Sequence, residues 1–419
     1  MFRFETKSSD SPRLTNAAAY IHLRMNPLRV ESASERPIRV LHLTTVDMTL
    51  ALVLEAELRT GVGLGHDMHA ASAPGPFEAR ILATGAVFWP VPAFRRDWSL
   101  RSDLAASRQV WRLVRAVRPD VLHTHTPKAG VVGRIVGRIA GVPVVVNSVH
   151  GLWQPRTGSS LQRLKGTLVW AVEAFASLFS HAELYLNQQD RDALHRFVRT
   201  KGEVVGSGID LARFAFSESD RTRVRAEWGI EPDEVLVVGV GRQVAEKGIF
   251  ELASAAQRLR RPKADGRIRR VRFVWVGPTD ESKADAIGAA MEGLELVGMR
   301  DDMRAVYAAC DVFALPSYRE GLSMSGMEAA ACGRALVVSD IRGCRELGRQ
   351  GNEVLLVPPG DVDALEQALA RFIDDAGLRT AFGESAARYA TTMFDHRNIS
   401  SKWWDVYRRL LASARAKRR

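Results

Sequence analysis

Short apolar runs alternate with helical patterns along most of this 419-residue chain. The strand-like runs are Arg39–Leu43, Val121–His125 and Pro143–Ser148 in the first half, and Val235–Val240, Val271–Val276, Asp311–Leu315, Ala335–Ser339 and Val354–Val357 in the second. Helical segments between successive strands are typical of parallel sheets that are covered by helices. The pattern therefore predicts an α/β protein.

A glycine-rich turn, Gly206–Asp210, lies near mid-chain and separates the two sets of strands. The chain is long enough for two domains, each with its own core. We expect an N-terminal domain at residues 37–208 and a second α/β domain at 209–385, with a cleft between them. Residues 1–36 are polar and unpatterned, so we expect a disordered extension whose true start is either Met1 or Met25.

The net charge of +11 is unevenly distributed along the chain. Residues 1–210 contain 26 Lys and Arg against 18 Asp and Glu, a balance of +8, which indicates a polyanionic partner for the first half. No zinc knuckle, RNA-binding aromatic motif or helix-turn-helix signature is present, so we expect no nucleic-acid partner. An anionic membrane surface fits the charge better.

Three further features bear on the compartment. The three cysteines lack metal-ligand spacing and are expected to be reduced, buried thiols of a cytoplasmic protein. No apolar run of about 18 residues predicts a spanning helix, and no signal peptide is recognisable. We therefore expect a cytoplasmic protein that attaches peripherally to the inner face of the membrane.

The segment Pro316–Glu328 offers the clearest chemistry. Glu320 follows a strand-like run, and Glu328 lies eight residues later on the next predicted helix, which Ser323 can cap. A helix N-terminus favours phosphate, and carboxylates accept hydrogen bonds from hydroxyl groups. These groups match a nucleotide sugar, which carries a sugar, a diphosphate and a ribose.

Two cations follow the first strand of the second half. Arg242 and Lys247 lie in the segment Gly241–Gly248, beyond the carboxyl end of the strand, where ligands bind in open α/β sheets. Such cations can reach a diphosphate. The spacing is not that of a P-loop, so ATP is not expected. No Asp-x-Asp motif follows a strand, so we expect neither a metal nor another cofactor.

Eight segments, in the same order as in the family, resemble retaining family 4 glycosyltransferases between about Ile38 and Leu411. They are LHLTTVD (41–47), HTHTPKAGVVGR (123–134), NSVHG (147–151), GSGIDLARF (206–214), VGRQVAEKG (240–248), VWVGPTDESKADAI (274–287), ALPSYREGL (314–322) and SDIRGCRE (339–346). The resemblance implies the GT-B fold, two Rossmann-like domains that face each other across a cleft. It also implies that residues 386–419 cross back to the first domain, with a last helix near Asn398–Ala412 anchored by Trp403, Trp404 and Leu410.

The resemblance also implies roles for individual residues. Arg242 and Lys247 would bind the donor diphosphate, Glu320 the transferred sugar and Glu328 the ribose, with Gly321, Leu322 and Ser323 completing the donor site. His150 matches a histidine that hydrogen-bonds the donor sugar near the reacting carbon. Catalysis would then involve His150, Glu320, Arg242 and Lys247, without a covalent nucleophile.

The acceptor is expected in the first half. Thr126 and Lys128 stand at a helix N-terminus, where the diphosphate of a lipid acceptor could bind. The alternative is that Thr126 only caps the helix and Lys128 is solvated. Asp47 could receive an acceptor proton or merely cap a helix. His123 and His125 share one strand face, but a zinc site would need a third ligand that the sequence does not reveal.

One amphipathic helix carries the membrane prediction. Between Ser102 and Arg118, the core stripe is expected to be Ala106, Val110, Leu113, Val114 and Val117. Arg108, Arg112 and Arg115 form a row on the opposite side, beside Leu104 and Trp111, as suits a headgroup interface. The alternative is a solvated basic face.

Taken together, the residues and the resemblance predict a metal-independent, retaining glycosyltransferase of surface polysaccharide biosynthesis. It would transfer a hexose or N-acetylhexosamine from a UDP-sugar to a polyprenyl-diphosphate-linked saccharide, as enzymes of lipid-linked oligosaccharide assembly do. Two alternatives are a GT-B sugar-nucleotide 2-epimerase and a non-catalytic nucleotide-binding scaffold of a glycan-assembly complex.

Overall fold

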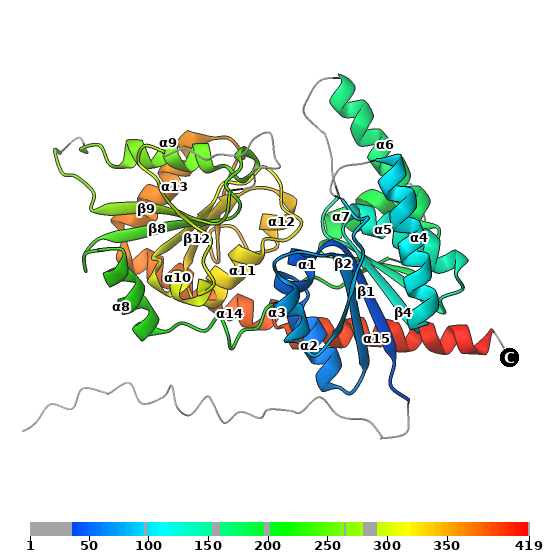
Figure 1. Ribbon diagram of the computed structural model, residues 1–419. Helices are drawn as coiled ribbons and strands as arrows, with labels where there is room; N and C mark the ends of the chain where they lie inside the picture. Colours follow the sequence, from blue (N-terminus) through cyan, green and yellow to red (C-terminus); the bar gives the residue numbers. More distant parts are fainter. Residues whose placement is uncertain are drawn as a thin grey trace, which may run out of the picture. The chain divides into compact units, whose positions relative to one another are not determined.

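The computed structural model describes residues 36–95, 99–152, 160–196, 202–263, 265–279 and 291–417 (Figure 1). Except for Arg36, the predicted disordered extension lies outside the described residues, and so does 280–287 of the VWVGPTDESKADAI segment. Two parallel sheets account for all of the described strands that belong to a sheet. This arrangement confirms the predicted α/β class.

The first sheet has seven strands in the order β3-β2-β1-β4-β5-β6-β7. The strands are β1 (Arg39–Val46), β2 (Asp67–Ala73), β3 (Val87–Pro90), β4 (Val121–His125), β5 (Val144–Val149), β6 (Ala182–Tyr185) and β7 (Gly202–Val204). Its helices are α1 (Asp47–Leu52), α2 (Glu55–Gly63), α3 (Glu78–Leu82), α4 (Leu100–Val117), α5 (Pro127–Ile139), α6 (Ser160–Ser177) and α7 (Gln188–His195).

Alternating strand residues build a separate core on each face of this sheet. Leu41, Leu122 and Val145 point to one face and pack with apolar residues of α4 and α5; α6 in turn packs on α5. Val40 and Val121 point to the other face, toward α1, α2 and the C-terminal helix α15 (His396–Ala416). The period of two thus assigns each strand residue to one of two cores.

The second sheet has six strands in the order β10-β9-β8-β11-β12-β13. They are β8 (Val235–Val240), β9 (Val271–Val276), β10 (Glu295–Gly298), β11 (Val312–Leu315), β12 (Ala335–Ser339) and β13 (Leu355–Val357). The helices are α8 (Glu218–Glu227), the 3₁₀ turn η2 (Ala245–Lys247), α9 (Ile249–Leu259), α10 (Met303–Ala309), α11 (Met324–Ala331), α12 (Arg342–Arg345), α13 (Val362–Asp374) and α14 (Ala376–Met393).

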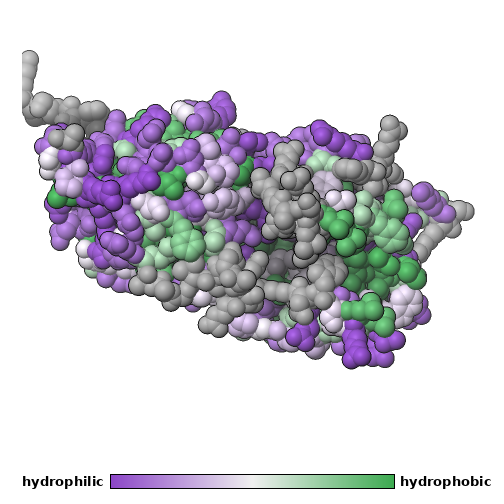
Figure 2. Space-filling model, turned by 90° about the horizontal axis from the view of Figure 1, so that it is seen from above, coloured by the Kyte–Doolittle hydropathy of each residue, from purple (hydrophilic) through white to green (hydrophobic). Residues whose placement is uncertain are grey.

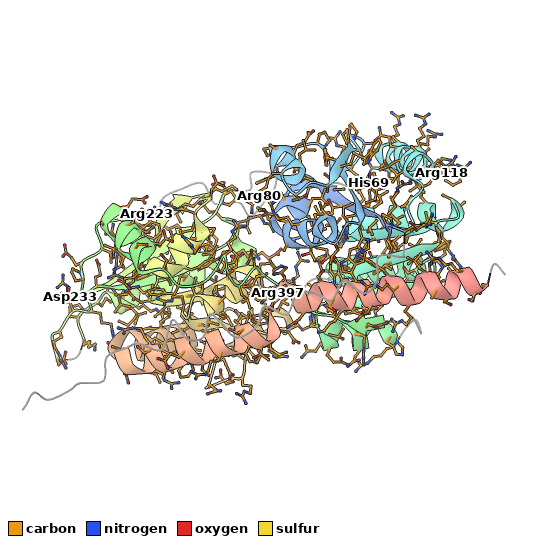
Figure 3. All side chains as sticks on the ribbon, turned by 90° about the horizontal axis from the view of Figure 1, so that it is seen from below. His69, Arg80, Arg118, Arg223, Asp233 and Arg397 are labelled. Atoms are coloured by element: carbon orange, nitrogen blue, oxygen red, sulfur yellow. The ribbon has the colours of Figure 1, made fainter. Side chains whose placement is uncertain are left out.

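The chain passes between the two sheets twice, and the two crossings are hydrogen-bonded to each other. Ile209 donates its N–H to the carbonyl of Phe394 at 2.8 Å, and His396 donates its N–H back to Ile209 at 3.1 Å. A Cβ on Gly208 would lie 2.4 Å from the Cα of His396, so only glycine allows this approach. After the crossing, α15 begins near Arg397 and runs along the first sheet (Figure 3).

The predicted last helix and its anchors are confirmed. Helix α15 extends the expected range, Asn398–Ala412, at both ends. Trp403 and Trp404 are buried in the core of the first sheet, and Leu410 packs against that core half-buried. The first half therefore completes its core with residues from the far end of the chain.

The sequence pattern left several strands unpredicted. Strands β2 and β3, on one side of the first sheet, and β6 and β7, on the other, were not expected, and neither was β10 in the second sheet. Strand β2 is rich in alanine and carries few large apolar residues, while β7 has only three residues. Such segments give little periodic signal.

We predict that Trp404→Ala lowers the free energy of unfolding of the first half by about 3–5 kcal/mol, because it removes a fully buried aromatic side chain. Urea unfolding followed by circular dichroism measures the effect. The control is Lys402→Ala on the exposed side of the same helix, which should shift stability by less than about 0.5 kcal/mol. Equal midpoints for the two variants would contradict the anchoring role of α15.

Candidate active site

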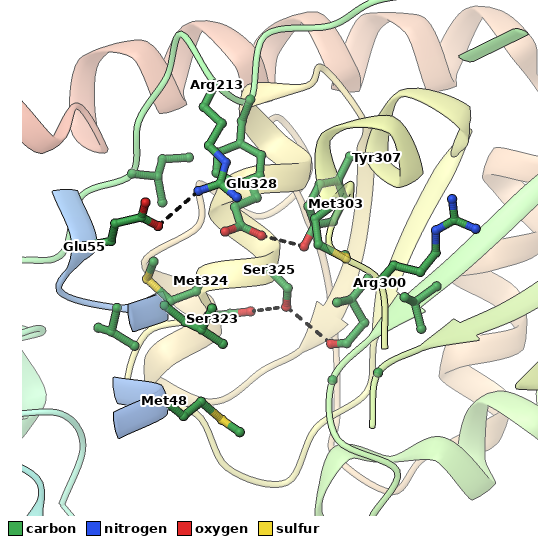
Figure 4. A pocket seen from close by; sticks show the side chains of 18 of the residues that line it. Met48, Glu55, Arg213, Arg300, Met303, Tyr307, Ser323, Met324, Ser325 and Glu328 are labelled. Carbon is green, nitrogen blue, oxygen red and sulfur yellow. Dashed lines mark hydrogen bonds and ion pairs between the residues drawn. The ribbon is translucent and has the colours of Figure 1, made fainter. Parts of the chain in front are cut away.

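A cavity of about 840 Å³ is lined by residues from both halves of the chain (Figure 4). Arg242 and Lys247 line it just beyond β8, and Glu320 and Glu328 line it beyond β11 and on α11. The first half contributes residues of α1 and α2, such as Glu55. The structure therefore brings together the four charged residues that were predicted to bind the donor.

Lys247 and Glu320 form an ion pair in this cavity. The Nζ of Lys247 lies 2.6 Å from the Oε1 of Glu320, and both side chains are largely buried, with 17% and 10% of their surface exposed. Because burial strengthens charge-assisted hydrogen bonds, the pair holds both side chains in place. An entering anion would compete with Glu320 for the ammonium group.

Glycines bring the Glu320 loop against the His150 loop. A Cβ on Gly321 would lie 1.9 Å from the carbonyl oxygen of His150, and a Cβ on Gly151 would lie 2.8 Å from the Cα of Gly321. The side-chain amide of Asn187 also donates to the carbonyl of Gly321 at 3.1 Å. Backbone contact of this kind fixes His150 beside Glu320.

A second ion pair supports the same contact. The Arg342 guanidinium on α12 pairs with Asp190 on α7 and donates to the carbonyl of Leu152 at 2.6 Å. Asp190 also accepts from Asn187 at 2.9 Å. These residues were not predicted, although Arg342 lies within a segment that resembles the family.

The start of α11 agrees with the sequence. The hydroxyl of Ser323 accepts from the N–H of Gly326 at 3.1 Å, which confirms the predicted N-cap. Leu322 is buried, and Ser323 and Ser325 line the cavity. The positive end of the helix dipole therefore lies at the cavity, where it favours an anion.

Glu328 occupies an unusual environment for a carboxylate. It accepts a hydrogen bond from the hydroxyl of Tyr307 at 2.7 Å, and burial raises its pKa to about 7 against the smaller opposing effects of that bond and of Arg213 and Arg80. Figure 4 shows Arg213 beside Glu328, reaching toward Glu55, with which it forms an ion pair. Glu328 can thus change its charge near neutral pH.

A cluster of histidines lies between β1, β4 and α15. His42, His123 and His125 are fully buried, and His125 is hydrogen-bonded to His150 at 3.1 Å. Burial lowers the pKa of His42 to about 3 and that of His150 to about 4, and it lowers the pKa values of the other two well below their usual range. All four rings are therefore neutral at neutral pH.

His42 is a third potential metal ligand beside His123 and His125, which the sequence alone did not reveal. The parallel register pairs His42 with His123, so the three ring nitrogens lie within 4.8 Å of one another. The signal was present, because His42 lies on a predicted strand with the same period of two. It was missed because the order of the strands was unknown.

The predicted acceptor residues are not brought together. Thr126 lines a second cavity of about 320 Å³, together with His150, Lys247 and Glu320. Lys128 is buried and its ammonium lies 2.6 Å from Asp103. Asp47 is also buried, and its carboxylate accepts from the backbone N–H groups of Met48 and Phe77. The roles of Lys128 and Asp47 remain predictions.

Helix α4 has the predicted faces. Its buried residues are Ala106, Val110, Leu113, Val114 and Val117. Arg108, Arg112 and Arg115 are exposed on the other side, as are Leu104 and Trp111. Among the described residues, no helix is long and apolar enough to cross a membrane.

Comparison with solved structures shows the same fold elsewhere. HepE of Anabaena, solved in complex with UDP, has a TM-score of 0.72 at 20% identity, with 88% of this chain and 99% of HepE covered. Sucrose-phosphate synthase of Thermosynechococcus elongatus has a TM-score of 0.75 at 19% identity, with 90% and 100% covered. Two parallel sheets and a returning C-terminal helix define the GT-B class, to which this fold belongs.

Sequence comparison identifies the family. Residues 53–213 match the family described as Glycosyltransferase Family 4, and residues 234–375 match Glycosyl transferases group 1. A D-inositol 3-phosphate glycosyltransferase of Kribbella flavida is 30% identical over 295 residues, 65% of this chain and 67% of that protein. The chain belongs to glycosyltransferase family 4, and it is a glycosyltransferase that uses a nucleotide sugar. This result rules out the two alternatives, a sugar-nucleotide 2-epimerase and a non-catalytic scaffold.

Two relatives act on lipid-linked substrates, according to their names. One is the UDP-Gal:alpha-D-GlcNAc-diphosphoundecaprenol alpha-1,3-galactosyltransferase of Escherichia coli, 29% identical over 69% of this chain and 75% of that protein. The other is the N,N'-diacetylbacillosaminyl-diphospho-undecaprenol alpha-1,3-N-acetylgalactosaminyltransferase of Campylobacter jejuni, 25% identical over 72% of this chain and 80% of that protein.

We predict that binding of a nucleotide sugar such as UDP-glucose weakens about tenfold between pH 8 and pH 6. The pKa of Glu328 is raised to about 7, so the carboxylate becomes protonated as the pH falls through 7 and would then accept less well from the two ribose hydroxyls that it is predicted to bind. Calorimetry across this range measures the affinity and the proton release that accompanies binding. In Glu328→Gln the affinity should be lower and nearly independent of pH; an unchanged slope would assign the titration to another group.

Proposed function

We propose that the protein is a retaining, metal-independent glycosyltransferase that transfers a hexose or N-acetylhexosamine from a UDP-sugar to a polyprenyl-diphosphate-linked saccharide. The main observation behind this proposal is that the two cavities share one ion pair. Lys247 and Glu320 line both the 840 Å³ cavity and the 320 Å³ cavity. A donor in the first and an acceptor in the second would meet at these residues.

The larger cavity supports a nucleoside diphosphate sugar as the donor. Arg242 and Lys247 would stabilise the charge of the leaving diphosphate, as a metal does in other enzymes, and the N-terminus of α11 would add its dipole. Glu328 would accept from the ribose hydroxyls. Glu320, which lines both cavities, and His150, which lines the smaller one, would contact the sugar where the cavities meet. UDP is proposed because HepE was solved with UDP and the E. coli relative is named for UDP-Gal.

The lining of the smaller cavity supports an acceptor-binding site that extends toward α6. Val169 and Trp170 of α6 line this cavity together with Thr126, His150 and Glu320. A saccharide could therefore extend from the ion pair toward α6, with Thr126 as one of its contacts. The names of the two lipid-linked relatives support a polyprenyl-diphosphate carrier, and hence a role in surface glycan assembly.

We predict that the purified full chain elongates a polyprenyl-diphosphate-linked saccharide when supplied with a UDP-sugar in the presence of a chelator. Mass analysis of the lipid product identifies the transfer. Glu320→Ala should lower turnover about 10²–10³-fold with little effect on UDP affinity, because Glu320 is expected to touch the sugar. Glu328→Ala should weaken UDP itself; equal effects on UDP affinity would refute this division of roles, and loss of activity on chelation would refute metal independence.

We also propose that the protein lies peripherally on the cytoplasmic face of the membrane through α4 and α6. Both helices pack against α5 on one face of the first sheet. Helix α4 offers the exposed Arg108, Arg112 and Arg115, and α6 offers a row of exposed apolar residues, with Leu164 66%, Leu168 64% and Phe175 56% exposed. Figure 2 shows hydrophobic side chains gathered at the end of the molecule that the first half forms. Cationic and apolar groups together suit an anionic bilayer surface.

We predict that reversing Arg108, Arg112 and Arg115 to Glu releases the protein from anionic vesicles in a co-sedimentation assay. Each basic residue near the surface contributes about 1 kcal/mol of attraction, so the loss should be several hundredfold or more. High salt should weaken but not abolish attachment of the wild type, since the apolar contact of α6 is not screened.

The matched control reverses Arg261, Arg267 and Arg388, which are exposed residues of the second half, and alters the net charge by the same amount. This control should sediment like the wild type. Sedimentation of the α4 variant to the same extent would show that α4 is a solvated face. Replacement of Leu164, Leu168 and Phe175 by Ser then tests α6 alone.

A further inference from the structure

Three histidines form a hydrogen-bonded chain that ends at the proposed reaction centre. The Nδ1 of His42 lies 3.0 Å from the Nε2 of His125, and the Nδ1 of His125 lies 3.1 Å from the Nε2 of His150. The first two rings are fully buried and stacked, with ring centroids 5.3 Å apart. His150 lines the smaller cavity, and its Nδ1 is the ring nitrogen that the chain does not use.

Neutral rings make this chain directional. Because each neutral imidazole has one N–H and one acceptor nitrogen, the hydrogen bonds must all run the same way. If they run from His42 to His150, every ring carries its proton on Nδ1 and His150 presents an N–H to the cavity. If they run in the opposite direction, every ring carries its proton on Nε2 and His150 presents an acceptor.

The buried end of the chain favours the first direction. The Nε2 of His42 has no hydrogen-bond partner among the described residues. The ring of Trp403 stacks 6.2 Å from that of His42, and its buried indole N–H likewise has no partner in the part of the chain that the structure describes. A protonated Nε2 on His42 would add a second donor on a ring stacked with that of Trp403, whereas an unprotonated Nε2 has a dipole of the opposite sense to the indole N–H. The Nε2 of His42 lacks a partner among the described residues in either direction, so the cost of an unmatched buried group is similar for both, and the electrostatic match to the indole N–H favours the first.

The ring nitrogens of His42, His123 and His125 are close enough to hold a metal ion. Their existing hydrogen bonds, however, favour the hydrogen-bonded histidine chain over a metal site. His123 is bonded on both sides, to Ser148 at 2.8 Å and to the hydroxyl of Tyr407 at 2.5 Å. His42 and His125 are bonded to each other. A metal would have to displace all of these bonds, so the cluster is already satisfied except at the Nε2 of His42.

We infer that His42, His125 and His150 form a relay that fixes His150 as the Nδ1–H tautomer, with His125 as the positioning residue. His150 then donates a neutral N–H to an oxygen of the bound substrate, either a sugar hydroxyl or a phosphate. The assignment of that substrate rests on the proposed function. The tautomer of His150 does not depend on the proposed function, because the hydrogen bonds between the three histidines form without a ligand.

The direct test is the tautomer of His150 in the ligand-free full chain. Long-range ¹H–¹⁵N correlation spectra of the histidine-labelled protein, assigned by single substitutions, distinguish Nδ1–H from Nε2–H rings. The expected result is Nδ1–H for His42, His125 and His150. An Nε2–H signal for His150 would overturn the inference, whatever the protein's substrate proves to be.

Variants of His125 test its role as a positioning residue. In His125→Asn the amide N–H₂ can still donate to His150, so the tautomer and turnover should be retained within a few-fold. In His125→Leu that donor is lost, so kcat should fall about tenfold or more while KM for the UDP-sugar changes little. Equal kcat values in the two variants would contradict the positioning role.

A matched core control separates positioning from stability. His123→Gln perturbs a ring that is equally buried and contacts His125 at 4.1 Å between centroids, but lies outside the chain. Thermal unfolding should show similar losses for His123→Gln and His125→Leu, whereas only the latter should change the His150 signal. A change of the His150 tautomer in the His123 variant as well would show a general packing effect and overturn the inference.

Discussion

The contact between the His150–Gly151 loop and the Glu320–Gly321 loop is the constraint on which the site depends. Two backbones approach so closely that a single methyl group on Gly321 would fall within 1.9 Å of a carbonyl oxygen. Because backbone atoms cannot move aside as a flexible side chain can, small residues at both positions let the two halves approach this closely beside the ion pair of Lys247 and Glu320. Asn187 and Arg342 reinforce it with polar bonds on the same side. All four residues of this junction line the smaller cavity, and Glu320 lines the larger one as well.

Several cationic side chains in the larger cavity are already paired with carboxylates before any ligand enters. Lys247 is paired with Glu320, and Arg213 is paired with Glu55. Glu328 is held by Tyr307 with a pKa raised to about 7. A diphosphate that binds as proposed would therefore meet cations that are already positioned, and it would replace protein carboxylates as their partner. Preorganised charges of this kind stabilise developing charge without the cost of reorganising during the reaction.

Much of the fold could be predicted because the relevant signals are local. Strands β4, β8, β9 and β12 match their predicted ranges residue for residue, and the Ser323 cap was visible in the sequence. The burial pattern of α4 was also correct. What could not be predicted depends on strand order and side-chain pairing across the sheet. His42 became part of the cluster only through its register with His123. The pattern suggested a solvated or ligand-binding Lys128, yet its side chain is buried and pairs with Asp103 on the neighbouring helix.

The return of α15 to the first sheet has a consequence for synthesis on the ribosome. The face of that sheet formed by β1, β4 and β5 is covered by Trp403, Trp404 and Tyr407, which are made about 200 residues after β7 is complete. At about 5–20 residues per second, this face waits about 10–40 s for its cover. The N-terminal half is thus the first to be translated and the last to be finished. During that interval an open apolar surface makes the nascent chain a natural client for holding chaperones.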